Sequence, residues 1–184
     1  MKKTNNKTKN IYTVLKIKEK SNGILFNTCD IFKSEEDAVN FYHREAYDHI
    51  KKHKLYNVQY LTKYEPYEFS TYKGEEDVYS TIRTHSIEDI KNQTLYIITI
   101  GIKKPNKFVH LKKMTGYTLV FTSKEMALAE FNKITKELIE KYKLNKNEYI
   151  LSEDNTSFIT EHNLNSDNIN QIYISANIEE KEFE

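Results

Sequence analysis

The feature that most limits the folds open to this chain is an internal repeat, because its two halves follow one pattern. The β-rich run at residues 11–16 matches the run at residues 95–100, and the order of the matched segments is kept until residues 82–89 reach residues 173–180. Between them the register aligns residues 31–34 with 120–123, Ala38 with Ala127, Tyr42 with Phe131, Lys54 with Lys143 and Tyr60 with Tyr149. The chain is therefore predicted to hold two copies of one module.

Each copy is predicted to form two strands joined by a hairpin, then a helix, then two more strands joined by a hairpin. Asn22-Gly23 is a hairpin signal, and Ser34 and Ser123 are natural N-caps at the starts of the two helices. We predict an α+β protein of two tandem β-β-α-β-β modules, each a four-stranded antiparallel sheet with one helix, related by a pseudo-twofold axis.

The modules are assigned to residues 11–90 and 95–180. Residues 1–10 are rich in Lys, Asn and Thr and are predicted to be disordered. They lack the apolar core of a signal peptide. Residues 181–184 are predicted to form an acidic tail. The single cysteine excludes an internal disulfide, and no apolar run approaches the about 20 residues that span a bilayer. The sequence predicts a cytoplasmic protein without a membrane segment.

Charge is balanced overall and is predicted to be uneven locally. The 28 lysines and arginines nearly cancel the 27 aspartates and glutamates, which argues against the basic field of a general nucleic-acid coat. If every hairpin and helix reverses the chain, lysines gather where the helices end, whereas the acids of residues 64–77 and 148–167 gather where the helices begin. Each module is thus predicted to be bipolar, although charges that merely offset the helix dipoles would give a similar pattern.

The segment at residues 64–72 interleaves four aromatic side chains with carboxylates. Tyrosine offers a large contact area, and aromatic residues are enriched at protein interfaces, so this acidic edge suits a basic partner. The predicted partner-binding residues are Tyr64, Glu65, Tyr67, Glu68, Phe69, Tyr72, Glu75 and Glu76. The competing interpretation is that Tyr64, Tyr67 and Phe69 only cover the sheet of their own module.

Candidates for catalysis or metal binding are weak. The four glycines form no phosphate-cradling loop, and Cys29 lacks an activating pattern, so it is predicted to be a structural thiol. His49 and His53 have the spacing of two metal ligands on one helix face, with Glu45 as a third, but their counterparts Leu138 and Tyr142 favour a position at the helix–sheet or module boundary. We predict no catalytic residues, no cofactor and no metal.

These observations favour a non-catalytic inhibitor or adaptor whose acidic, tyrosine-rich edges bind a larger, basic nucleic-acid-binding protein or ribonucleoprotein. In its size, its Lys-, Asn- and Ile-rich composition and its lack of catalytic motifs, the chain resembles the small proteins with which phages and mobile elements block bacterial defence, anti-CRISPR proteins among them. No motif carries this resemblance, so it implies no residue roles.

The alternative is a weak nucleic-acid-binding module. Its lysine-rich ends would contact phosphates, while Tyr56, Phe108 or Tyr142 would stack on bases. The predicted phosphate-binding residues are Lys51, Lys52, Lys54, Lys103, Lys104, Lys141 and Lys143. The near-zero net charge and the presence of only Arg44 and Arg83 as arginines weigh against this reading. An enzyme of unrecognised type is the third reading.

Overall fold

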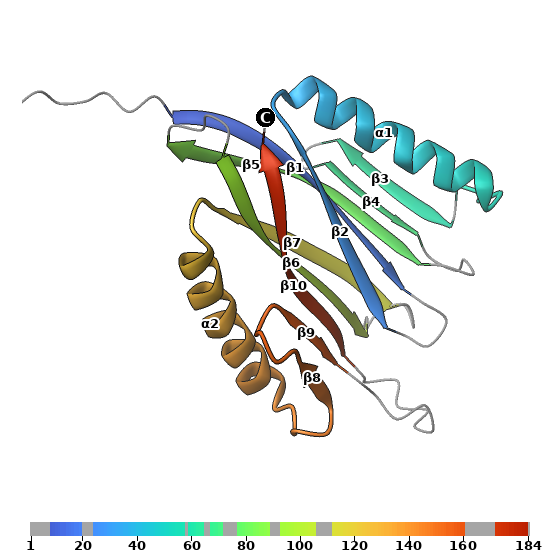
Figure 1. Ribbon diagram of the computed structural model, residues 1–184. Coiled ribbons are helices and arrows are strands. Elements are labelled where there is room, and N and C mark those ends of the chain that lie inside the picture. Colours follow the sequence, from blue (N-terminus) through green and yellow to red (C-terminus); the bar gives the residue numbers. More distant parts are fainter. Residues whose placement is uncertain are drawn as a thin grey trace, which may run out of the picture.

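The computed structural model shows two similar halves in one chain (Figure 1). The first half contains β1 (Thr8–Glu19), β2 (Leu25–Phe32), α1 (Glu35–Lys52), β3 (Tyr60–Tyr64), β4 (Tyr67–Thr71) and β5 (Val78–Glu88). The second contains β6 (Gln93–Pro105), β7 (Lys112–Phe121), α2 (Lys124–Tyr142), β8 (Tyr149–Leu151), β9 (Ser157–Thr160) and β10 (Tyr173–Phe183). The structure describes residues 8–19, 24–57, 59–64, 67–71, 77–88, 93–105, 112–160 and 172–183.

Each half forms one antiparallel sheet with one helix, which confirms the predicted α+β class and tandem modules. The strand orders are equivalent, β2-β1-β5-β4-β3 in the first sheet and β7-β6-β10-β9-β8 in the second. Each sheet has five strands, whereas four were predicted. In the first module the additional strand arises because the chain reverses after Tyr64, which pairs with Tyr67. Pro66, which lies between them in the sequence, has no N–H group to offer a continuous strand.

The additional reversal changes which end of the molecule receives the start of β5. Val78 pairs with Lys18, and the Glu19 N–H donates to the Asp77 carbonyl oxygen at 3.0 Å, so Asp77 lies where the helices end. The predicted position of Asp77, at the opposite end, was wrong, because the prediction lacked the strand that reverses the chain once more. The neighbouring Glu75 and Glu76 lie outside the described residues.

The two modules resemble each other more closely in structure than the sequence alignment suggested. Thr71 and Thr160 occupy equivalent positions, and the hydroxyl oxygen of each accepts a hydrogen bond at 2.8 Å from the first strand residue after the loop, Val78 or Ile174. Val78 therefore corresponds to Ile174, and the alignment of residue 82 with residue 173 was wrong. The reason is loop length, because the hydrogen-bonded residues are 7 apart in the first module and 14 apart in the second.

Both ends of the chain also contain more strand residues than the sequence predicted. β1 begins at Thr8, which pairs with Glu88, so residues 8–10 belong to the sheet. β10 continues to Phe183, which pairs with Gln93, so residues 181–183 extend a strand and form no separate tail. The pairing partners come from distant parts of the chain, which is why a local pattern of charged residues concealed both strands.

The two helices begin and end in the same way. Ser34 and Ser123 are N-caps, confirming the prediction, and their hydroxyl oxygens accept the N–H groups of Asp37 at 3.1 Å and Met126 at 3.3 Å. At the other end the chain turns through a left-handed residue, Lys54 with φ 49° and Lys143 with φ 51°. These matched caps fix the position of each helix on its sheet.

The two sheets pack face to face, and the helices lie on the outer faces (Figure 1). Strand β2 contacts β6 and β10, while its equivalent β7 contacts β1 and β5. Such reciprocal contacts are the mark of an isologous, pseudo-twofold interface. Alternate residues of β1 serve different layers: Val14 belongs to the core under α1, whereas Leu15 and Ile17 belong to the core between the sheets. The modules therefore share one interior.

Two glycines permit the close approach of the sheets. Gly101 on β6 pairs with Gly116 on β7, and both face Ile17 of the first sheet. A Cβ atom on Gly116 would lie 2.4 Å from Ile17 Cδ1 and 2.6 Å from the Ile100 carbonyl oxygen. On the other glycine it would lie 2.6 Å from the side-chain oxygen of Asn27. The sequence analysis treated these glycines only as evidence against a phosphate loop.

We predict that Gly116→Ala lowers the free energy of unfolding by about 1–3 kcal/mol, because the added methyl group overpacks the contact between the sheets. Ile17→Val removes the Cδ1 atom that this methyl group meets. Urea denaturation followed by circular dichroism should show that the double variant loses less stability than the sum of the two single losses, with a coupling of about 1 kcal/mol. Additive losses would contradict the packing described here.

Candidate functional site

The described residues of the predicted tyrosine-rich edge pack within their own module. Phe69 is only 1% exposed and belongs to the core under α1. Tyr67 is half-buried against the same helix, with its ring centroid 5.8 Å from that of Tyr42. These two side chains cover their own sheet, as the competing interpretation held. For Tyr64 the structure gives the backbone pairing, and Glu65, Tyr72, Glu75 and Glu76 lie outside the described residues.

Glu68, the remaining predicted residue, already has partners in its own sheet. Its carboxylate accepts hydrogen bonds from Lys63 Nζ at 2.7 Å and from the Tyr79 hydroxyl at 3.2 Å. The bond from Lys63 holds the pKa of Glu68 below its usual range, with a further contribution from Lys113 on the second sheet. Glu68 is therefore ionised, but its negative charge is largely offset by the Lys63 ammonium group of its own sheet.

Exposed carboxylates gather instead where the two helices begin. The strands β1 and β6 start at this end, since Ile11 and Leu95 share one cluster between the sheets. The hairpin of β8 and β9 turns on this side of the sheet, and its turn lies beside the middle of β10, where the Ile178 N–H donates to the Thr156 carbonyl oxygen. We call these carboxylates the acidic end; its members are Glu35, Glu36, Asp37, Glu125, Glu153 and Asp154.

Local hydrogen bonds keep parts of the acidic end ionised. The Ser123 hydroxyl donates to Glu125 at 2.7 Å and lowers the pKa of that carboxyl group. The hydroxyl groups of Ser152 and Thr156 donate to Asp154 at 2.7 and 2.8 Å and lower its pKa as well. The acidic first turns of the helices are visible in the sequence, but the predicted partner-binding residues were chosen from residues 64–76.

The lysines of the alternative site lie at the opposite end, and all but one of them are exposed or half-buried. Lys51, Lys52, Lys54, Lys141 and Lys143 are exposed around the helix C-termini. Lys104 is half-buried, and its Nζ lies 5.3 Å from the centre of the Tyr142 ring, within the range of a cation–π contact. The exception is Lys103, which is 3% exposed. Its burial removes it from the predicted phosphate-binding set.

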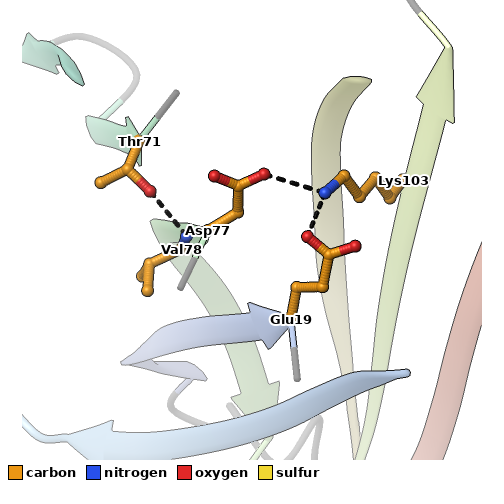
Figure 2. Close-up of polar contacts among 5 residues, drawn as sticks. All are labelled: Glu19, Thr71, Asp77, Val78 and Lys103. Atoms are coloured by element: carbon orange, nitrogen blue, oxygen red, sulfur yellow. Dashed lines mark hydrogen bonds and ion pairs between the residues drawn. The ribbon is translucent and has the colours of Figure 1, made fainter. Parts of the chain in front are cut away.

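Lys103 instead joins the two modules (Figure 2). Its ammonium group, at the end of β6, forms ion pairs with Glu19 at the end of β1 and with Asp77 before β5, the latter at 2.8 Å. Both carboxylates are partly exposed, whereas the lysine is enclosed. A buried charge requires such partners, because leaving it unpaired in a low-dielectric interior is strongly unfavourable. The cluster therefore fixes the ends of the two sheets relative to each other.

We predict that Lys103→Met destabilises the protein by about 3 kcal/mol, because Glu19 and Asp77 lose the cation that they share. The matched variant Lys104→Met removes a lysine one position along the same strand and should change stability by less than about 1 kcal/mol. Thermal and urea denaturation of the two variants measures the difference. Equal losses would show that the ion pairs contribute no specific stability.

A second polar cluster lies between the sheets. The hydroxyl groups of Thr13 and Thr118 are 2.8 Å apart, and Nε2 of His85 lies 3.0 Å from each of them. Burial, together with the smaller effect of the nearby Arg83, lowers the pKa of His85 to about 4. Cys29, on the neighbouring strand, is 1% exposed, and burial raises the pKa of its thiol well above the usual range. A neutral thiol in this position is a poor nucleophile.

The depressed pKa of His85 predicts that acid destabilises the protein. Between pH about 6.5 and about 4 the unfolded chain binds a proton at this histidine that the folded chain does not, so stability falls as pH falls. One such group contributes a slope of at most about 1.4 kcal/mol per pH unit. His85→Gln should lack this contribution, and urea denaturation of both proteins at pH 4–7 tests it. Parallel stability curves would contradict it.

The two histidines of α1 lie at the boundary between helix and sheet, as the sequence favoured. Their ring centroids are 4.4 Å apart, and the centroid of His49 lies 6.1 Å from that of Phe69 in the core. Glu45, the third candidate ligand, forms an ion pair with Lys16 on β1. Within the described parts of the chain no group of three or more His, Cys, Asp or Glu side chains is placed to hold a metal ion.

Comparison with known proteins finds no matching family model, no matching curated protein and no matching solved structure. Among the described residues, neither helix combines the length and the apolar composition that crossing a membrane requires. The candidate site is therefore defined by the geometry of this chain alone, as two oppositely charged ends on a shared double-sheet interior.

Proposed function

We propose that the protein is a cytoplasmic, non-catalytic binding protein that acts as an inhibitor or adaptor on a larger, basic nucleic-acid-binding protein or ribonucleoprotein. A role against bacterial defence, of the kind that anti-CRISPR proteins fill, fits this proposal. The observation that carries it is the group of exposed carboxylates where the helices begin, which outnumber the exposed Lys33 and Lys124 beside them, while other exposed lysines gather where the helices end.

The acidic end is suited to a basic groove. Its carboxylates project from helix starts and from one tight turn, so they form a set of negative charges on a rigid scaffold. A protein that binds nucleic acid presents cations to phosphates, and carboxylates in that place compete for the same cations. Because the backbone that carries these carboxylates is already ordered, little backbone conformational entropy is lost on binding.

The polar interior supports the non-catalytic part of the proposal. Cys29, His85 and Lys103 are residue types that many enzymes use, and here Cys29 and Lys103 are buried and His85 is half-buried. Lys103 and His85 are engaged in contacts that hold the two modules together. Their contacts and burial are those of groups that contribute to the fold.

The test uses charge reversal at the acidic end. Glu36→Lys combined with Glu153→Lys changes exposed side chains of the acidic end that belong to different modules. We expect this variant to lose at least about tenfold in affinity for the partner, because opposing charges steer and hold the complex. Partner binding is measured by affinity capture from a bacterial lysate, with and without nuclease, followed by quantification of the captured protein.

The control is Glu137→Lys combined with Glu140→Lys, which makes the same change of net charge on the exposed face of α2. A stoichiometric partner that survives nuclease, is lost with the first variant and is retained by the control supports the proposal. A partner that both variants retain would exclude the acidic end as its binding site. Circular dichroism of each variant verifies that the fold is intact.

A further inference from the structure

The outer face of α1 carries aromatic side chains that the fold does not cover. Tyr47 is 64% exposed and Tyr56, just beyond the helix, is 75% exposed. Tyr47 lies one turn from Arg44 and one turn from Lys51, so the three side chains share one stripe. We call this surface the α1 outer face; its members are Arg44, Tyr47, Lys51, Lys52, Lys54 and Tyr56.

The repeat provides an internal control for these tyrosines. α2 has the same caps and the same buried stripe as α1, and in the register that aligns Lys54 with Lys143, Tyr47 corresponds to Lys136 and Tyr56 to Asn145. Both counterparts are exposed and polar. Because the second module folds in the same way without aromatic residues at these positions, packing does not account for the tyrosines of the first.

The charge around the two rings is positive. Arg44, Lys51, Lys52 and Lys54 are exposed, and Asp48 is the exposed acid among them. Glu45 adds little negative charge outward, because it forms an ion pair with Lys16. Over roughly 12 Å of helix from Arg44 to Lys52, the surface therefore combines several cations with flat, uncovered rings.

We propose that the α1 outer face binds single-stranded nucleic acid, with the cations contacting phosphates and Tyr47 and Tyr56 stacking on bases. This arrangement is the usual basis of sequence-tolerant strand binding. An acidic protein segment would match the charge, but the aromatic anchors of protein interfaces cluster in well-packed pockets, whereas these two rings stand uncovered among cations. Within α1 and the loop described after it, the large hydrophobic side chains that are exposed are these two tyrosines. The inference rests on the proposed function, since it assigns the nucleic-acid component of a ribonucleoprotein to this face.

Binding is measured by fluorescence anisotropy with a labelled 20-nucleotide single strand of mixed sequence, as RNA and as DNA, in 50 mM salt. The expected dissociation constant is about 1–100 μM, the range of non-specific, phosphate-driven binding. The affinity should fall as salt rises, because cations bound to the strand are released on binding. No binding at 200 μM protein in 50 mM salt would overturn the proposal.

The decisive variant is Tyr47→Lys combined with Tyr56→Asn, which gives the first module the residues of the second. It adds one positive charge while removing both rings. If stacking contributes, affinity falls by about tenfold or more despite the added charge. An unchanged or increased affinity would show that binding is purely electrostatic and would overturn the stacking site. The fold should survive, because the second module carries the same residues at equivalent positions.

A charge variant and its control test the phosphate contacts. Lys51→Gln with Lys52→Gln should weaken binding and reduce the slope of log affinity against log salt by about 1.4, which corresponds to two phosphate contacts on a single strand. Lys133→Gln with Lys136→Gln removes two lysines from the equivalent face of α2 and should leave the affinity unchanged. Equal effects of the two variants would place the strand elsewhere.

Polyglutamate in place of the strand distinguishes the other occupant. If it binds as tightly, and the tyrosine variant does not weaken it, the surface recognises acidic protein and the nucleic-acid proposal fails. The tyrosine variant also separates this inference from the proposed function. If this variant still captures a nuclease-resistant partner, that result supports the acidic end as the partner's binding site. The strand-binding measurement then tests nucleic-acid binding by the α1 outer face independently.

Discussion

The close contact between the two sheets is the constraint on which the rest of the structure depends. Gly101 and Gly116 leave room for Ile17, and Asn27 donates from its side chain across the interface to the Ser175 carbonyl oxygen at 2.9 Å. The core between the sheets thus belongs to neither module alone. Because the opposite face of each sheet is filled by its helix, both faces of the central strands are buried, and the polar groups that remain inside must find partners there.

Those partners explain why the interior holds residue types that usually attract functional interpretation. Lys103, Glu19 and Asp77 close one end of the interface, and His85 joins Thr13 and Thr118 nearer the other. Their bonds cross between modules, so they select one relative position of the sheets in addition to contributing energy. The surfaces proposed to bind partners lie outside this interior, on the helix faces and at the two ends of the molecule.

The sequence was sufficient for the repeat, the fold class, both helices and their caps, because these depend on local spacing that two copies report independently. It was insufficient for the hairpin between β3 and β4, since a single reversal near Pro66 leaves little trace in a run of alternating aromatic and charged residues. That omission placed Asp77 at the wrong end of the molecule. The burial of Lys103 was missed for another reason. It results from the packing of one sheet on the other, and no pattern along the strand indicates it. Tyr47 was overlooked because α1 also carries partly buried apolar residues outside its main buried stripe, such as Phe41 and Ile50. Spacing alone does not tell which of its apolar or aromatic side chains are exposed.

A dimer of identical subunits carries every surface twice. A residue that contributes to recognition therefore occurs at two sites, and the dimer can bind two ligands. In this chain the pseudo-twofold partners are joined, and the matched ends of α1 and α2 show how similar the scaffolds have remained. Their surfaces nevertheless differ, with tyrosines on one helix and lysine and asparagine on the other. Covalent linkage therefore keeps a pseudo-symmetric interface while allowing a surface feature to occur only once in each chain.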